Sequence, residues 1–244
     1  MAQELINFDR EWAAMLSGGA STDPSAVQRY FVQHGRYTAG TATCYKPALL
    51  TGSSANQHVA KGLLVGTRFH SAPVVRVGDG KLMQLGQTLA ADGRWRLIAF
   101  AGQGDHGQAT SPVGKLCSYL TESAQSPVRR FTPASADVDC VFDVRAVFQQ
   151  SHHTLRLTDL PDLLFPHKGS LGLRDYEKAF CAPSDASQNI YDMRGIDRVY
   201  GCLVVVRPDQ YIAQVLKLTD TSALAVFFDG FMQSIQLLIR PCEV

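Results

Sequence analysis

The chain has 244 residues, 45% hydrophobic and 18% charged, a composition that excludes a disordered protein or a coiled coil and predicts one large globular domain, with or without an appendage. Its formal net charge is +1 with both signs interspersed, so we expect neither nucleic acid nor an anionic membrane surface as a partner. No apolar run reaches the roughly 18 residues that a membrane-spanning helix needs, and the first residues lack a signal-peptide pattern, so the sequence predicts a cytoplasmic protein.

The N-terminal part of the chain predicts two helices. Apolar residues recur at helical spacing over residues 2–16, which indicates an amphipathic helix. Asp23-Pro24 supplies an N-cap and a first-turn proline for a second helix, which ends at His34-Gly35. We expect residues 1–55 to form a helical segment and residues 56–244 a separate domain.

The remainder of the chain alternates between strand and helix patterns. Two short apolar runs on either side of Gly78-Asp79-Gly80 predict a hairpin. Residues 121–138, rich in Ser, Pro and Ala, predict a surface loop. After the hairpin, the order of elements is that of an α/β, thioredoxin-like domain, in which helices flank a central mixed sheet. The predicted elements are strands over 95–101, 140–148, 201–206 and 211–218, and helices over 112–120, about 185–193 and from Asp220 onward.

The loop after the strand 95–101 lacks the chemistry that such a domain usually presents there. Instead of a Cys-x-x-Cys motif, residues 102–107 read Gly-Gln-Gly-Asp-His-Gly. The six cysteines form neither a C-x-x-C pair nor a Cys/His cluster at zinc-like spacing. We therefore expect no thiol redox activity and no metal, and we expect Cys117, Cys140 and Cys202, which lie in apolar stretches, to be small buried side chains.

Several segments carry a resemblance to a known family. They are residues 2–12, 66–73, 91–96, 191–197 and 201–211. In this order they resemble the C-terminal region of the FAD-dependent aromatic hydroxylases of the phenol 2-monooxygenase type. The resemblance extends to about residue 231. It implies that the first 50 residues close off the flavin and substrate domains, and that the rest is a thioredoxin-like domain with a part in subunit contacts.

The flavin-binding part of that family has no counterpart in this sequence. Residues 102–107 have the spacing G-x-G-x-x-G, but they lie within the thioredoxin-like part of the chain and do not open a dinucleotide-binding fold. The resemblance therefore implies the tail of a hydroxylase without its FAD-binding domain. We expect no cofactor, and no hydroxylation of an arene by the chain alone.

Two groups of residues are candidate catalytic and substrate-binding sites. Asp105 and His106 precede a helix N-terminus, where an acid/base pair would act beside a stabilised oxyanion, although a solvated turn has the same sequence pattern. His70 is a candidate titratable catalytic group next to Arg68 and Phe69, which would bind a phenolate or carboxylate. The alternative is that these residues are an exposed group on a loop.

Two tyrosines complete the candidate site. Tyr37 and Tyr45 flank Gly40 in a segment that resembles the family's chain leaving the substrate domain. The Tyr37 hydroxyl would donate to a carbonyl oxygen in catalysis, and Tyr45 would contact the substrate. Tyrosines in such positions also serve as packing residues with a satisfied hydroxyl.

Three functional hypotheses follow. The first is a free-standing enzyme that binds an aromatic or polyketide-like small molecule and promotes a cofactor-independent cyclisation, isomerisation or dehydration in secondary metabolism. The second is a non-catalytic module that forms a homodimer or associates with a full-length flavin hydroxylase. The third is a fragment of a longer protein.

Overall fold

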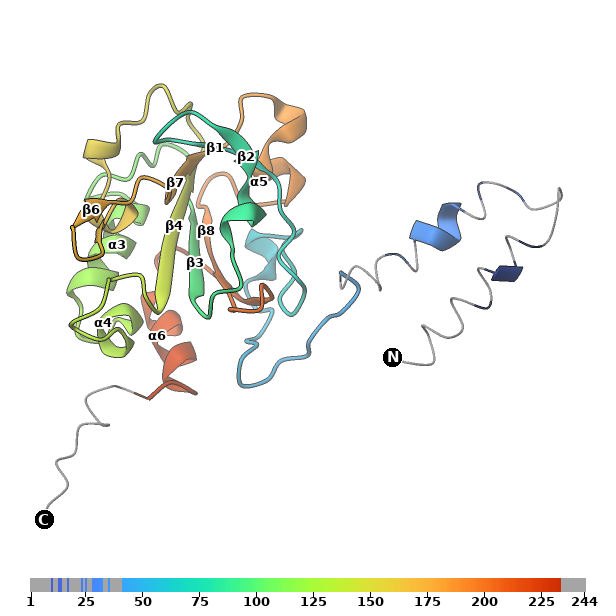
Figure 1. The fold of residues 1–244 in the computed structure, drawn as a ribbon, viewed down its shortest axis with the longest axis horizontal. Coiled ribbons are helices and arrows are strands. Elements are labelled where there is room, and N and C mark those ends of the chain that lie inside the picture. The colour runs from blue at the N-terminus through green and yellow to red at the C-terminus, as the bar shows by residue number, and fades with distance from the viewer. Residues whose placement is uncertain are drawn as a thin grey trace, which may run out of the picture. The chain divides into compact units, whose positions relative to one another are not determined.

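The computed structural model describes residues 41–233 and, before them, residues 10, 13, 14, 17, 23, 25, 28–32 and 35. The chain divides into two units, Met1–Cys44 and Tyr45–Val244. In the first unit, residues 28–32 are helical (Figure 1), and the Ser25 amide donates to Asp23 Oδ1 at 3.0 Å, as the predicted N-cap requires. Most of the predicted helix over 2–16 lies outside the described residues. The division expected at residue 55 stays a prediction.

The second unit is built on a seven-stranded sheet in the order β2-β1-β7-β4-β3-β8-β9. β3 runs parallel to β4 and antiparallel to β8, and β9 pairs antiparallel with β8. This arrangement confirms the predicted α/β, thioredoxin-like fold. The strands are β1 Pro73–Arg76, β2 Leu82–Gln84, β3 Trp95–Phe100, β4 Phe142–Phe148, β7 Ala179–Cys181, β8 Cys202–Val206 and β9 Ile212–Leu216, with β5 His167–Lys168 and β6 Leu173–Arg174 forming a separate hairpin.

Helices cover both faces of the sheet (Figure 1). Successive side chains of a strand point to opposite faces, so Trp95 and Leu97 of β3 join the core with α3, α4 and α6, whereas Ile98 and Phe100 join the core with α5 and η2. No helix of the described residues is long and apolar enough to span a membrane. The helices are α3 Pro112–Glu122, α4 Pro127–Phe131, α5 Ile190–Met193 and α6 Thr221–Asp229, and the 3-10 turns are η2 Gln57–Val59, η3 Leu85–Thr88, η4 Leu157–Asp159, η5 Asp162–Leu164 and η6 Ala186–Gln188.

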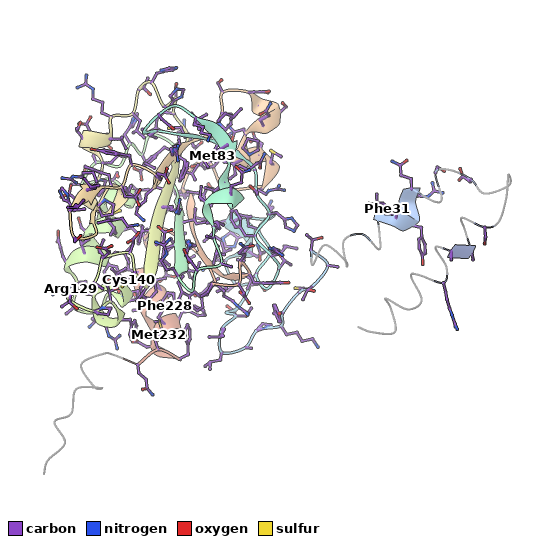
Figure 2. The ribbon with its side chains drawn as sticks, viewed as in Figure 1. Phe31, Met83, Arg129, Cys140, Phe228 and Met232 are labelled. Atoms are coloured by element: carbon purple, nitrogen blue, oxygen red, sulfur yellow. The ribbon has the colours of Figure 1, made fainter. Side chains whose placement is uncertain are left out.

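An aromatic cluster fixes α6 on the sheet. Phe228, labelled in Figure 2, lies edge-on to Trp95 and Phe142, with ring centroids 5.1 and 4.8 Å apart. Asp220 caps the helix by accepting from the Ala223 amide at 3.2 Å. The predicted start of the last helix is confirmed.

Three predictions from the sequence are wrong in detail. The helix over 185–193 is interrupted, because the Asn189 side chain accepts from the Tyr191 amide and starts a new turn after η6. Residues 121–138 are not all surface loop, since α4 forms there and buries Phe131. Cys140 is exposed, because it lies in the turn that precedes β4, with its amide bonded to the Asp137 carbonyl.

Charged side chains are buried at the amino ends of β3 and β4. Lys178 Nζ lies 2.6 Å from carboxylate oxygens of both Asp139 and Asp143. Asp143 also pairs with Arg96 at 3.0 Å and with Arg145 at 2.8 Å. We call these five residues the ionic network. All five residues are buried and each charge faces an opposite one, and Arg96 also pairs with Asp92 at 2.8 Å. The network therefore links β3, β4 and the residue before β7.

Candidate functional site

The loop between β3 and α3 occupies the position where thioredoxins carry their thiols. Asp105 is buried there, and its two carboxylate oxygens accept from the amides of Gly107 and Val113, each at 2.8 Å. The second bond satisfies an unpaired amide in the first turn of α3, where a negative charge is also favoured by the helix dipole. The Asp105 carboxylate therefore links the loop to the first turn of α3 by hydrogen bonds.

His106 lies apart from the Asp105 carboxylate although it is the next residue. Its side chain is half-exposed, and its backbone amide donates to Gln108 Oε1 at 3.2 Å. Among the described residues, no hydrogen bond joins the His106 ring to Asp105. The acid/base roles of both residues stay predictions.

The buried thiols are unsuited to redox chemistry. Burial raises the pKa of Cys117 and of Cys181 to about 12, and it raises the pKa of Cys202 further. A thiol in this state carries almost no thiolate near neutral pH, and the thiolate is the reactive form. In the described part of the chain, no group of three or more His, Cys, Asp or Glu side chains is arranged to hold a metal ion.

A cavity of about 650 Å³ opens beside the N-terminus of α3. Its walls come from η2, the Asp105 loop, the first turn of α3, the turn before β8 and the turn after β9. The sequence did not predict this cavity. The signal for it was two glycines, at which the backbones of the β3–α3 loop and the turn before β8 come close together. A Cβ on Gly102 would lie 2.5 Å from the Val199 carbonyl oxygen, and one on Gly201 would lie 2.1 Å from that of Phe100.

The second group of candidate residues surrounds the turn between β8 and β9. Arg68 Nη2 donates to Gln210 Oε1 at 2.6 Å, and the Phe69 amide donates to the Gln210 carbonyl at 2.8 Å. Phe69 is buried in the core and His70 is half-exposed. The loop of residues 68–70 is therefore tied to the turn by hydrogen bonds.

Tyr45 joins the same turn. Its ring lies edge-on to Tyr211 at 4.8 Å, and the Arg207 guanidinium stacks over both rings. Its amide donates to the Gly66 carbonyl at 2.8 Å. Tyr45 thus anchors the start of the second unit, whereas Tyr37 lies outside the described residues.

The two groups lie at opposite ends of the sheet. Antiparallel pairing matches Arg96 with Val206 and Phe100 with Cys202, so the turn after β8 and the loop after β3 are separated by the length of β3. At about 3.3 Å per residue, this separation is roughly 17 Å. Asp105 and His106 therefore do not share a single small-molecule site with Arg68 and Tyr45. The substrate-binding roles of Arg68, Phe69 and Tyr45, and the catalytic role of His70, stay predictions.

Curated relatives match nearly the whole chain. The chain is 54% identical over 241 residues to the 3-hydroxybenzoate 4-monooxygenase of Comamonas testosteroni, and the alignment covers 96% of this chain and 38% of that protein. It is 31% identical over 245 residues to the FAD-dependent monooxygenase terD of Aspergillus terreus, covering 96% of this chain and 40% of that protein. The chain thus spans about two fifths of the length of these relatives.

Solved structures with a similar chain trace are distant in sequence. The thioredoxin domain of a thiol-disulfide oxidoreductase from Bacteroides vulgatus is 14% identical, with a TM-score of 0.42, and covers 70% of this chain and 99% of that chain. A thioredoxin-like protein from Bacteroides caccae is 12% identical, with a TM-score of 0.45, and covers 91% of this chain and 60% of that chain. The order and direction of the strands in this chain carry the fold assignment by themselves.

A family match covers most of the second unit. Residues 43–236 match the family described as "Phenol hydroxylase, C-terminal dimerisation domain". The prediction of a cofactor-independent cyclase, isomerase or lyase is wrong, because the match is to a dimerisation module and the relatives are named as monooxygenases. Nor do these matches support the predicted aromatic or polyketide-like ligand. The resemblance to the C-terminal region of aromatic hydroxylases is confirmed, and the chain belongs to the phenol hydroxylase C-terminal dimerisation domain family.

Proposed function

We propose that this chain is a dimerisation module of a flavin-dependent aromatic hydroxylase, which joins two copies of the chain into a homodimer. The observation that carries the proposal is the match of residues 43–236 to a dimerisation domain. The relatives named as monooxygenases support it, because they align with this chain along only about two fifths of their length.

The architecture of the second unit suits a structural role. Both faces of its sheet are packed with apolar side chains, and the ionic network fixes the strands at one end. Preorganised surfaces bind with a smaller entropic cost than mobile ones. A rigid unit of this kind is suited to holding two subunits at a defined geometry.

The proposal also covers the role of the first unit, a second protein partner and the location of the dimer in the cell. We infer that residues 1–55 form the segment that closes the flavin and substrate domains, and that a full-length flavin hydroxylase is a second partner. The proposal places this assembly in the cytoplasm. The 96% coverage of the chain by the Comamonas relative supports the first point, since an alignment of that extent includes most of the first unit.

Sedimentation velocity on the full chain tests the homodimer. Over about 0.1–100 μM, we expect a concentration-dependent species with twice the monomer mass of 26.6 kDa. A single monomeric species over the whole range would contradict the homodimer. Titration of the monomer with a full-length flavin hydroxylase would then show whether the second partner binds.

A further inference from the structure

One face of the second unit carries both a projecting aromatic side chain and a cavity. Tyr200 is 75% exposed at the rim of the 650 Å³ cavity beside α3, and its neighbour Val199 is also exposed. We propose that two copies of this chain meet at this face, with Tyr200 of each copy inserted into the cavity of the other. The inference rests on the proposed dimerisation and locates its contact surface.

The symmetry of a dimer favours this face over other exposed apolar side chains. In a two-fold dimer the same patch serves both subunits, so the patch must complement itself. A projecting ring beside a concave surface meets that requirement, because each copy offers one of each. The cavity volume falls within the roughly 300–1,000 Å³ of ligand pockets, which leaves room for a tyrosine side chain.

The segment that presents Tyr200 is held in place. Asp197 Oδ1 accepts from the amides of Val199 and Tyr200 at 2.8 and 2.9 Å. The close approach of Gly201 to β3 fixes the other side of the same turn. Since the backbone is already ordered and a tyrosine has only two side-chain torsions, insertion costs little conformational entropy.

The lining of the cavity carries charges of both signs. Lys217 lines the cavity, is exposed, and forms no ion pair with the described residues. Asp197 lines the same cavity and uses only Oδ1 in the bonds described above. In the proposed dimer, Lys217 of one copy would have Asp197 of the other as an acidic partner, and the reverse pair would form by symmetry.

Substitution of Tyr200 tests the location of the contact. Sedimentation velocity on Tyr200→Asp should show a dimer dissociation constant raised at least about tenfold, as for a central aromatic anchor. The matched control is Tyr176→Asp, which replaces a 50% exposed tyrosine on another loop and should change the constant less than about twofold. Equal thermal melts of both variants would show that they fold.

The outcomes separate this inference from the proposed function. A wild-type dimer that Tyr200→Asp leaves intact would overturn the inference while the dimerisation proposal stands. A wild-type monomer would overturn both.

A photo-crosslinker identifies the occupant of the cavity. Benzoylphenylalanine replaces Tyr200 in the full chain, and isotopically heavy and light copies are mixed before irradiation. We expect heavy–light products joined to residues 102–112 or 217–219. Products within one copy, joined to residues 1–44, would instead show that the first unit occupies the cavity and would overturn the inference.

Discussion

Gly201 shows how a single residue shapes the turn before β8. Its φ is 67°, and a Cβ there would lie 2.1 Å from the Phe100 carbonyl oxygen. Gly104, which lines the cavity, has a similar φ of 75° but open space around the position of a Cβ. Comparison of these two glycines therefore separates the effect of a positive φ from the effect of a steric contact at the Cβ position.

Alanine at these two positions should therefore have unequal effects. Gly104→Ala should lower the free energy of unfolding by about 1–2 kcal/mol, the cost of a left-handed alanine. Gly201→Ala should cost more, by at least about 1 kcal/mol, because the new methyl group displaces the end of β3. Urea denaturation of the wild type and both variants measures the difference, and equal losses would show that the turn relaxes away from Phe100.

For single residues, the sequence predicted the place of a side chain in the fold better than its role. It placed Asp105 before a helix N-terminus, and the structure agrees. It did not foresee that both carboxylate oxygens bind backbone amides, because those bonds depend on how the loop folds back on Val113. Tyr200 gave no signal at all, since a tyrosine beside a glycine is compatible with burial or with exposure.

Among the elements, α6 illustrates how an apolar pattern becomes packing. Its buried Phe228 contacts Trp95 of β3 and Phe142 of β4, whereas Val226 on the same helix is 71% exposed. Both residues lie in the same helix but in different environments. Substitution of Phe228 therefore reports on core packing, and substitution of Val226 reports on helix propensity.

Truncation of the buried ring should be far more costly than truncation of the exposed side chain. Phe228→Ala should lower the free energy of unfolding by about 3–5 kcal/mol, because it removes apolar contacts and leaves a cavity. Val226→Ala should change it by less than about 0.5 kcal/mol. Thermal and urea unfolding give both values, and a similar loss in the two variants would contradict the packing described for α6.

The long patterned elements were predictable and the short ones were not. β3, β4, α3 and α6 have runs of apolar residues or caps that appear in the sequence itself. β7 has three residues and α4 has five, too few to show a period. β7 exists because β1 and β4 pair with it, which is a contact between distant segments.

At the scale of the whole molecule, the ionic network links stability to pH. Burial raises the pKa of Asp143, but the charges of Arg145 and Lys178 outweigh this effect and lower the pKa below its usual value. Burial acts in the same way on Asp139, and the hydrogen bond and charge of Lys178 again lower its pKa overall. Both carboxylates are therefore ionised in the folded state at a pH where they begin to protonate in the unfolded chain.

Acid should thus destabilise the protein through this network. The contribution is fully present above the unfolded aspartate pKa of about 3.9 and is lost as pH falls through the lower folded values. Urea unfolding should show a smaller free energy of unfolding at pH 3 than at pH 5. Asp143→Asn should reduce that difference, and Glu122→Gln, at an exposed site outside the network, should not.

The anchoring of Tyr45 has an evolutionary consequence. The chain enters the second unit beside Tyr211, at the end of the sheet opposite the Tyr200 face. In a dimer joined through Tyr200, the chain would enter each second unit at the end of the sheet away from the contact. Substitutions around Tyr45 could then be selected without changing how the subunits pair.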